Sequence, residues 1–354
     1  MLDKELIFFV PSLEQPRVIK RILQEAKSYS KIKVFAFTRN IYSVNNFYKL
    51  DKADNISYEI LGSFNDSDLL SRLSLYMKLI LEVYKKYGLN KKNIYIFGFD
   101  LRFISLFIIN KFIIYEISDI MWLYKTEIQK KILKGIDFYM AKSSNRVIFT
   151  SEGFYKRYFS FLNESKVEIK ENKFKSYNVV NPITRIKVDQ IRIAYIGAFR
   201  YRDIINNLIQ VCSNYKDKVV LNFYGDGETR IINEIVVAAK LHDNIRYHGA
   251  FKNPESLEKI YAANNINFVA YDNKKENERV AMPNKFYESG YFNIPIVCSC
   301  NTYLADKVSE LNIGWIIEPT LEGIDHFIKQ MSIDDIIDKH NRETKINKEI
   351  FEEC

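Results

Sequence analysis

Residues 281–297, AMPNKFYESGYFNIPIV, predict a short helix that is followed by a buried strand. Pro283 suits the first helical position, because its missing N–H has no partner to lose there. Lys285 and Glu288 stand three residues apart and therefore share one face of the helix. The free amides near Asn284, together with Lys285, favour a phosphate, and Glu288 could accept hydrogen bonds from the hydroxyls of a ribose. These residues suit a nucleotide-diphosphate-sugar site; a surface helix with an ordinary Lys/Glu pair is the alternative interpretation.

On both sides of a polar connection at residues 181–190, strand-like and helix-like segments alternate along the chain. This alternation is typical of parallel sheets covered on both faces. We therefore predict an α/β protein with two Rossmann-like, doubly wound domains that face a ligand cleft at the carboxyl ends of their strands. The expected domains are residues 1–184, residues 185–320 and a helical tail, residues 321–354, that packs back on the N-terminal domain. Residues 122–141 are expected to form one helix.

Charge is distributed unevenly along the 354 residues. Residues 1–190 carry 32 Lys and Arg against 20 Asp and Glu, and residues 191–354 carry 20 against 24, which gives +12 and −4. The basic half predicts an anionic partner, and a membrane surface fits better than nucleic acid because aromatic residues accompany the basic ones. The helix expected at Glu127–Lys142 interleaves lysines with apolar residues, so it either lies on a bilayer or simply covers the sheet.

The sequence also bounds where the protein works. The charged N-terminus does not resemble a signal peptide, and no apolar run approaches the ~20 residues that span a membrane. The four cysteines lack metal-ligand spacing, as do the four histidines, so we expect free thiols in a reducing cytoplasm and no bound metal.

Three further positions are candidates for a site. The loop from Gly197 to Arg202 joins a strand to a helix, so its glycine could approach a ligand while Arg200 and Arg202 hold a diphosphate. A packing glycine beside two solvated arginines is the alternative interpretation. Phe251 could line a base, although ordinary core packing would also explain it. Asp119, after a strand of the first domain, could hold an acceptor hydroxyl or cap the next helix.

Taken together, these segments resemble the C-terminal domain of GT-B glycosyltransferases of family 4, in the bacterial capsule, O-antigen and exopolysaccharide branch. The resemblance covers about residues 190–320. It is carried, in order, by Gly197, Arg200 and Arg202; Phe223-Tyr-Gly-Asp-Gly; Tyr247-His-Gly; residues 283–290; and Ile294-Pro-Ile-Val.

The resemblance implies specific roles. Arg202 would replace the family's phosphate-binding lysine, with Arg200 beside it, while Lys285 and the amides near Asn284 would assist at the diphosphate. Glu288 would be the second acid of the family's Glu-x7-Glu motif and would hold the donor ribose. Two features depart from the pattern: Val280 stands where the first acid belongs, with Glu278 two residues early, and the N-domain histidine has no match, Asp119 or Glu116 being the nearest polar substitute.

The resemblance further implies a retaining glycosyltransferase that moves a sugar from a nucleotide-diphosphate donor to a lipid-linked saccharide, without metal or other cofactor. Asp119, Arg200 and Arg202 are its expected catalytic residues. Expected partners are the nucleotide sugar, the saccharide acceptor and a peripheral contact with an anionic membrane, at the inner face of the plasma membrane. A non-catalytic partner subunit of the same fold, or a sugar-nucleotide epimerase, are the alternatives.

Overall fold

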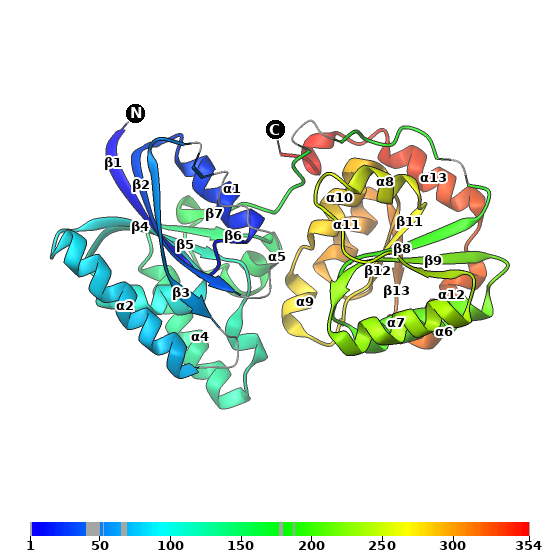
Figure 1. Cartoon of the computed structure of the whole chain (residues 1–354), viewed down its shortest axis with the longest axis horizontal. Helices are drawn as coiled ribbons and strands as arrows, with labels where there is room; N and C mark the ends of the chain where they lie inside the picture. The colour runs from blue at the N-terminus through cyan, green and yellow to red at the C-terminus, as the bar shows by residue number, and fades with distance from the viewer. Residues whose placement is uncertain are drawn as a thin grey trace. The chain divides into compact units, whose positions relative to one another are not determined.

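The computed structural model describes residues 2–39, 50–51, 53–64, 69–176, 180–186 and 188–353. The chain forms two compact units, Met1–Glu171 and Asn172–Cys354, called here the first and the second unit (Figure 1). The boundary predicted at residues 184 and 185 lies later in the chain. The difference arises because Phe174 packs on the second unit, with its ring centroid 4.7 Å from that of Tyr291.

The first unit is built on a parallel sheet of seven strands in the order β3-β2-β1-β4-β5-β6-β7. Its strands are β1 (Leu2–Val10), β2 (Tyr29–Arg39), β3 (Ile56–Phe64), β4 (Lys92–Phe97), β5 (Asn110–Ile117), β6 (Arg146–Phe149) and β7 (Val167–Ile169). Its helices are α1 (Pro16–Glu25), α2 (Leu69–Tyr87), α3 (Gly98–Ile104), α4 (Glu127–Lys142) and α5 (Glu152–Phe154), with the short turns η2 (Ser105–Phe107), η3 (Met121–Tyr124), η4 (Tyr155–Phe159) and η5 (Glu164–Lys166). Residues 6–10 of β1 are all fully buried, as expected for a central strand covered on both faces.

The second unit is built on six parallel strands in the order β10-β9-β8-β11-β12-β13. Its strands are β8 (Ile191–Phe199), β9 (Val219–Gly227), β10 (Ile245–Tyr247), β11 (Ile266–Val269), β12 (Ile296–Ser299) and β13 (Gly314–Ile317). Its helices are α6 (Arg202–Asn214), α7 (Thr229–Leu241), α8 (Leu257–Ala262), α9 (Glu276–Val280), α10 (Asn284–Phe292), α11 (Tyr303–Leu311), α12 (Leu321–Gln330) and α13 (Ile333–Glu343), followed by η6 (Lys348–Ile350). Strand order reverses at β8, and the open edge beyond its carboxyl end is where ligands bind in such sheets. The predicted pair of Rossmann-like domains is confirmed.

The helix predicted over residues 122–141 is wrong in one respect, because the segment is divided. The turn η3 ends before α4 begins, and Thr126 between them is extended at φ −61° and ψ 158°. The break lets Trp122 fold under α4, where its indole N–H donates to the Asp137 carboxylate at 3.0 Å.

The C-terminal tail is part of the second unit, where α12 packs against α6. His340 Nδ1 donates to the Asn293 carbonyl at 2.7 Å, and Lys348 Nζ donates to the Gly290 carbonyl at 2.6 Å. The tail therefore holds the carboxyl end of α10; its packing on the N-terminal domain stays a prediction. In the described part of the chain, no helix has both the length and the apolar character to cross a membrane.

Candidate functional site

Glycines form the carboxyl ends of β8 and β9 in the second unit. Gly197 and Gly225 are register partners on the two strands, with φ values of +117° and +145°. A Cβ on Gly225 would lie 1.8 Å from the Gly197 carbonyl oxygen, so any side chain there is excluded. The two strand ends therefore present bare backbone at the point where the strand order reverses.

Helix α10 begins beside the glycine-rich carboxyl ends of β8 and β9. Pro283 is its N-cap rather than its first helical residue, no side chain caps the amides, and Asn284 is exposed. Lys285 Cε lies 3.2 Å from where a Cβ of Gly197 would stand, and Lys285 Nζ lies 5.7 Å from the ring centroid of Phe251. The structure thus brings together Gly197, Lys285 and Phe251, which are far apart in the sequence.

Glu288 is buried one turn further along α10, with 4% of its surface exposed. Its Oε2 accepts from Lys285 Nζ at 2.5 Å and from the Tyr261 hydroxyl at 3.1 Å. Its Oε1 accepts only a long contact of 3.5 Å from Asn253 Nδ2 among the hydrogen bonds of the described residues. Because a carboxylate oxygen has two lone pairs, Oε1 can accept a further hydroxyl.

Arg200 follows β8 and is exposed. Burial raises the pKa of Tyr271 to about 12; the Arg200 charge opposes this rise, and the Glu288 charge adds to it. Both charges therefore act on Tyr271, which lies just after β11.

Arg202, the first residue of α6, is engaged elsewhere. Its guanidinium donates from Nε at 2.9 Å and from the second terminal nitrogen at 2.6 Å to Glu234 on α7. Asn206 also donates to this carboxylate, and the hydrogen bond from Arg202 is the main cause of the lowered pKa of Glu234. Arg202 therefore contacts α7. Among the described residues, it forms no hydrogen bond with Lys285 or Glu288. Sequence reasoning did not foresee this pair.

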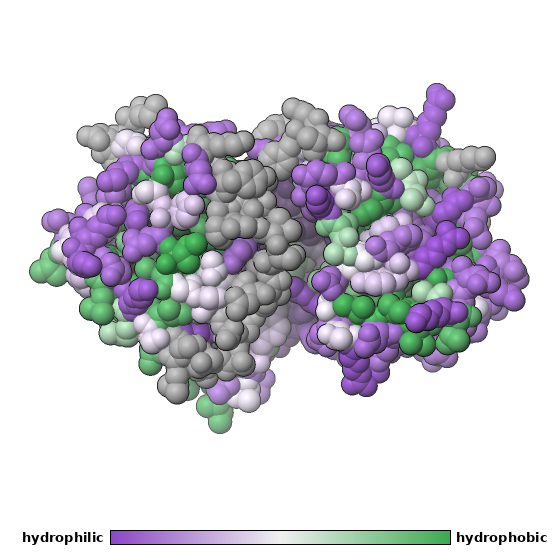
Figure 2. All heavy atoms as spheres, in the orientation of Figure 1, coloured by the Kyte–Doolittle hydropathy of each residue, from purple (hydrophilic) through white to green (hydrophobic). Residues whose placement is uncertain are grey.

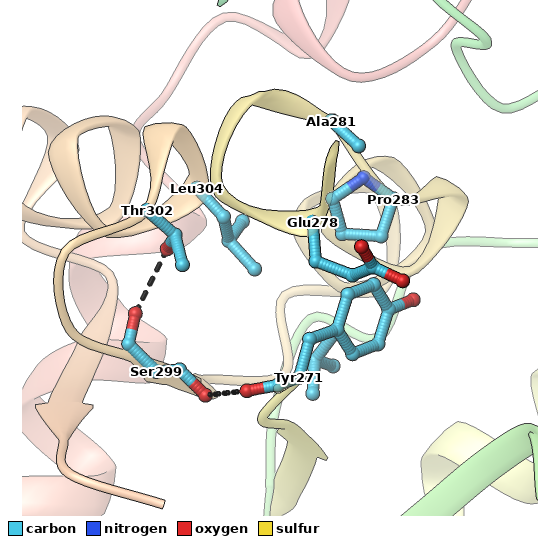
Figure 3. A pocket seen from close by; sticks show the side chains of 8 residues that line it. Tyr271, Glu278, Ala281, Pro283, Ser299, Thr302 and Leu304 are labelled. Carbon is cyan, nitrogen blue, oxygen red and sulfur yellow. Dashed lines mark hydrogen bonds between the residues drawn. The ribbon is translucent and has the colours of Figure 1, made fainter. Parts of the chain in front are cut away.

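A small concavity lies between α9 and α11, behind the start of α10. In Figure 3 the Glu278 side chain lies against the Tyr271 ring, and the Ser299 hydroxyl donates to the Tyr271 carbonyl at 2.6 Å. The lining residues are Val269, Tyr271, Glu278, Ala281, Pro283, Ser299, Thr302 and Leu304. Val280, in contrast, is a buried apolar residue, so Glu278 is the acid that this end of α9 presents to the concavity.

The acidic candidates of the first unit differ from each other. Asp119 is exposed after β5, and Ile120 is the N-cap residue of η3, with no side-chain capping bond. Glu116 is fully buried and accepts hydrogen bonds from Arg21 Nε at 3.0 Å and from the Tyr95 hydroxyl. Its carboxylate is therefore engaged in contacts inside the first unit. No cluster of three or more His, Cys, Asp or Glu side chains suited to a metal occurs within the described ranges.

No protein-family model matches the sequence, and no curated protein matches it either. Solved structures do match over nearly the whole chain. They include a sucrose-phosphate synthase from Thermosynechococcus elongatus (TM-score 0.70, 14% identity, 99% of this chain and 95% of that one) and HepE of Anabaena in complex with UDP-glucose (TM-score 0.68, 13% identity, 98% and 95%). A glycosyltransferase from Rickettsia africae matches with TM-score 0.66 and 16% identity over 99% and 95%. The chain therefore has the two-domain GT-B fold of these enzymes.

Proposed function

We propose that this protein is a glycosyltransferase that moves a sugar from a nucleotide-diphosphate donor to a hydroxyl group. The observation that carries the proposal is the arrangement around α10: a cation and a buried acid one turn apart, facing bare glycine backbone where the strand order reverses. The fold supports it, since the similar structures include glycosyltransferases and one that holds UDP-glucose.

The donor would use the residues as follows. Lys285, the amides near Asn284 and Arg200 would bind the diphosphate, because two cations and a helix start all favour an anion. Glu288 would accept from the ribose through Oε1, which has spare hydrogen-bonding capacity. Phe251 would pack on the base, and Glu278 would face the sugar. Arg202 would join the diphosphate only after exchanging Glu234 for phosphate.

The chemistry follows from the charge that develops on the leaving group. Departure of the nucleoside diphosphate concentrates negative charge on oxygen, and cations fixed beside it lower the barrier. Arg200 and Lys285 would supply this stabilisation without a metal. Asp119, from the first unit, would position the acceptor hydroxyl. Retention of configuration is part of the proposal and is supported only by the family resemblance.

The acceptor we propose is a lipid-linked saccharide of bacterial surface polysaccharide synthesis, such as capsule, O-antigen or exopolysaccharide, at the inner face of the membrane. The basic charge of residues 1–190 supports an anionic surface beside the acceptor. One similar structure, WaaB, is described as a lipopolysaccharide outer core galactosyltransferase (TM-score 0.64, 12% identity, 99% of this chain and 96% of that one).

The direct test is transfer. The full-length protein is incubated with labelled nucleotide sugars, with and without a bacterial membrane extract, and both released nucleotide and labelled lipid are measured. We expect acceptor-dependent transfer from one donor, and a loss of about a hundredfold in kcat/KM for Lys285→Ala. Lys240→Ala, an exposed lysine on α7, is the matched control and should retain full activity.

Two outcomes would overturn the proposal. Interconversion of the donor without any acceptor would identify an epimerase. Donor binding without transfer to any extract would identify a non-catalytic partner subunit. Val280, which stands where the family has an acid, favours this alternative.

A further inference from the structure

Three helical segments of the first unit share one face of its sheet. Residues of α2 and α3, among them Leu79 and Leu101, pack on one core cluster with Ile7 and Phe9 of β1. The Tyr84 hydroxyl of α2 donates to the carbonyl of Phe107 in η2 at 2.8 Å. These contacts make α2, α3 and η2 one continuous surface.

Helix α4 is joined to the same surface. Arg102 of α3, almost fully buried, donates to the Met140 carbonyl at 3.2 Å and to the Ser143 hydroxyl at 2.7 Å. Both acceptors lie at the carboxyl end of α4 or just after it. We call the exposed side of α2, α3, η2 and α4 the helical face.

The helical face carries more apolar surface than a sheet cover needs. On α2, Leu79 and Val83 are turned to the core, yet a second stripe at four-residue spacing is exposed, with Leu81 at 63%. This stripe consists of Leu73, Met77 and Leu81. Figure 2 shows hydrophobic side chains among hydrophilic ones over this part of the first unit. An amphipathic helix that only covers a sheet has one apolar stripe, so the second requires another explanation.

Helix α4 shows the same feature. Ile128 is 77% exposed and Ile132, one turn later, is 60% exposed, while Asp137, Met140 and Ala141 are the buried positions. Phe107 in η2, whose carbonyl accepts from Tyr84 of α2, is also exposed, at 59%. Exposed apolar side chains that gather on one face of a folded protein indicate an interaction site.

Lysines surround the apolar side chains of α4. Within the described part of the chain, none of Lys131, Lys134 and Lys142 forms an ion pair. Lys134 Nζ lies 5.4 Å from the ring centroid of Trp122, and Lys142 Nζ lies 5.2 Å from that of Phe161. The charges are therefore not neutralised by acids of the first unit's described residues.

We propose that the helical face docks the protein on an anionic lipid bilayer, with Ile128, Ile132 and the α2 stripe at the acyl boundary and the lysines among the lipid phosphates. Exposed aliphatic side chains interleaved with lysine are the pattern of an interfacial helix. A second copy of the chain is the other occupant to consider, but it would set lysine against lysine, which opposes association. This inference does not depend on the donor site.

Vesicle flotation of the full-length protein tests the proposal. Phosphatidylcholine vesicles are compared with vesicles that contain about 30% phosphatidylglycerol, at low and high salt. We expect binding to the anionic vesicles only, weakened by salt. The double variant Ile128→Ser with Ile132→Ser should bind about tenfold more weakly, and Lys131→Gln with Lys142→Gln roughly tenfold more weakly.

The matched control is Val237→Ser with Leu241→Ser, an exposed pair at the same spacing on α7 of the second unit. It should bind the anionic vesicles as the unchanged protein does. The proposal is overturned if the protein does not float with anionic vesicles, if the control loses binding equally, or if sedimentation reveals a dimer that the Ile128 and Ile132 substitutions abolish. A thermal shift with nucleotide sugars, measured in parallel, reports on the donor site separately.

Discussion

Gly225 is the position where the backbone itself dictates the residue. Its φ of +145° and the 1.8 Å approach of the Gly197 carbonyl exclude a Cβ. We expect Gly225→Ala to lower the free energy of unfolding by about 2–4 kcal/mol, measured by urea denaturation. Gly135→Ala on α4 is the control: nothing lies within 4 Å of its added Cβ, so it should gain about 0.5–1 kcal/mol. Equal stabilities of the two variants would refute the strand-end geometry.

The two arginines near the site should behave differently. Arg200 is exposed and forms no ion pair among the described residues, whereas Arg202 is bound bidentately by Glu234. If Arg200 contacts the diphosphate, Arg200→Ala should weaken donor binding at least about tenfold, a loss typical of a charge-assisted contact. Arg202→Ala should weaken it less, because a diphosphate must first displace Glu234. A larger loss for Arg202→Ala in calorimetric titration would assign the contact to Arg202 instead.

Residues close in sequence were predictable in a way that distant partners were not. Lys285 and Glu288 form the ion pair that their helical spacing indicates, at 2.5 Å. The Arg202–Glu234 pair joins positions 32 residues apart on two helices, and no local pattern selects Glu234 among the acids of the chain. The resemblance pointed to Arg202 as a phosphate ligand, and that role stays a prediction.

At the scale of elements, α4 depends on a buried acid. Burial raises the pKa of Asp137 from 3.8 to about 6, although hydrogen bonds from Tyr115 and Trp122 favour its carboxylate. The folded state therefore binds the proton of the Asp137 carboxyl group more tightly than the unfolded chain does. The contribution of this proton to the free energy of unfolding is complete below about pH 4 and is lost as the pH rises through about 6.

The variant Asp137→Asn removes this titration. From about pH 4 to about pH 7, the unchanged protein should lose about 3 kcal/mol of unfolding free energy relative to the variant, from the two-unit difference in pKa. Denaturation at several pH values measures it. Parallel curves for the two proteins would contradict a raised pKa.

The division of the segment that leads into α4 shows how far the sequence locates an element boundary. The start of α4 at Glu127, after the N-cap residue Thr126, is the bound expected for the lysine-rich helix, whereas the separation of residues 121–124 as η3 was not expected. The break depends on tertiary packing, because Trp122 is buried and its N–H donates to Asp137, fifteen residues later. Residues 65–68, Asn-Asp-Ser-Asp, offer side-chain acceptors that would cap the helix that follows, but they lie outside the described residues.

At the scale of the whole molecule, alternation of strands and helices was sufficient to predict both sheets. In each sheet the first three strands of the sequence lie in the order third, second, first, and the fourth strand pairs with the first. Dinucleotide-binding folds have the same order. Residues 172–176 have no periodic pattern and belong to the second unit through Phe174 and its packing on Tyr291. The domain bounds expected from the sequence stay a prediction.

The central claim is that a nucleotide diphosphate binds the second unit beside α10. Calorimetric titration of the full-length protein with a panel of nucleoside diphosphates and their sugars tests it most directly. We predict one-to-one binding of at least one of them, weakened about tenfold or more by Lys285→Ala and unchanged by Lys240→Ala. No binding by any of the panel, or equal affinity in Lys285→Ala and in the unchanged protein, would contradict the claim.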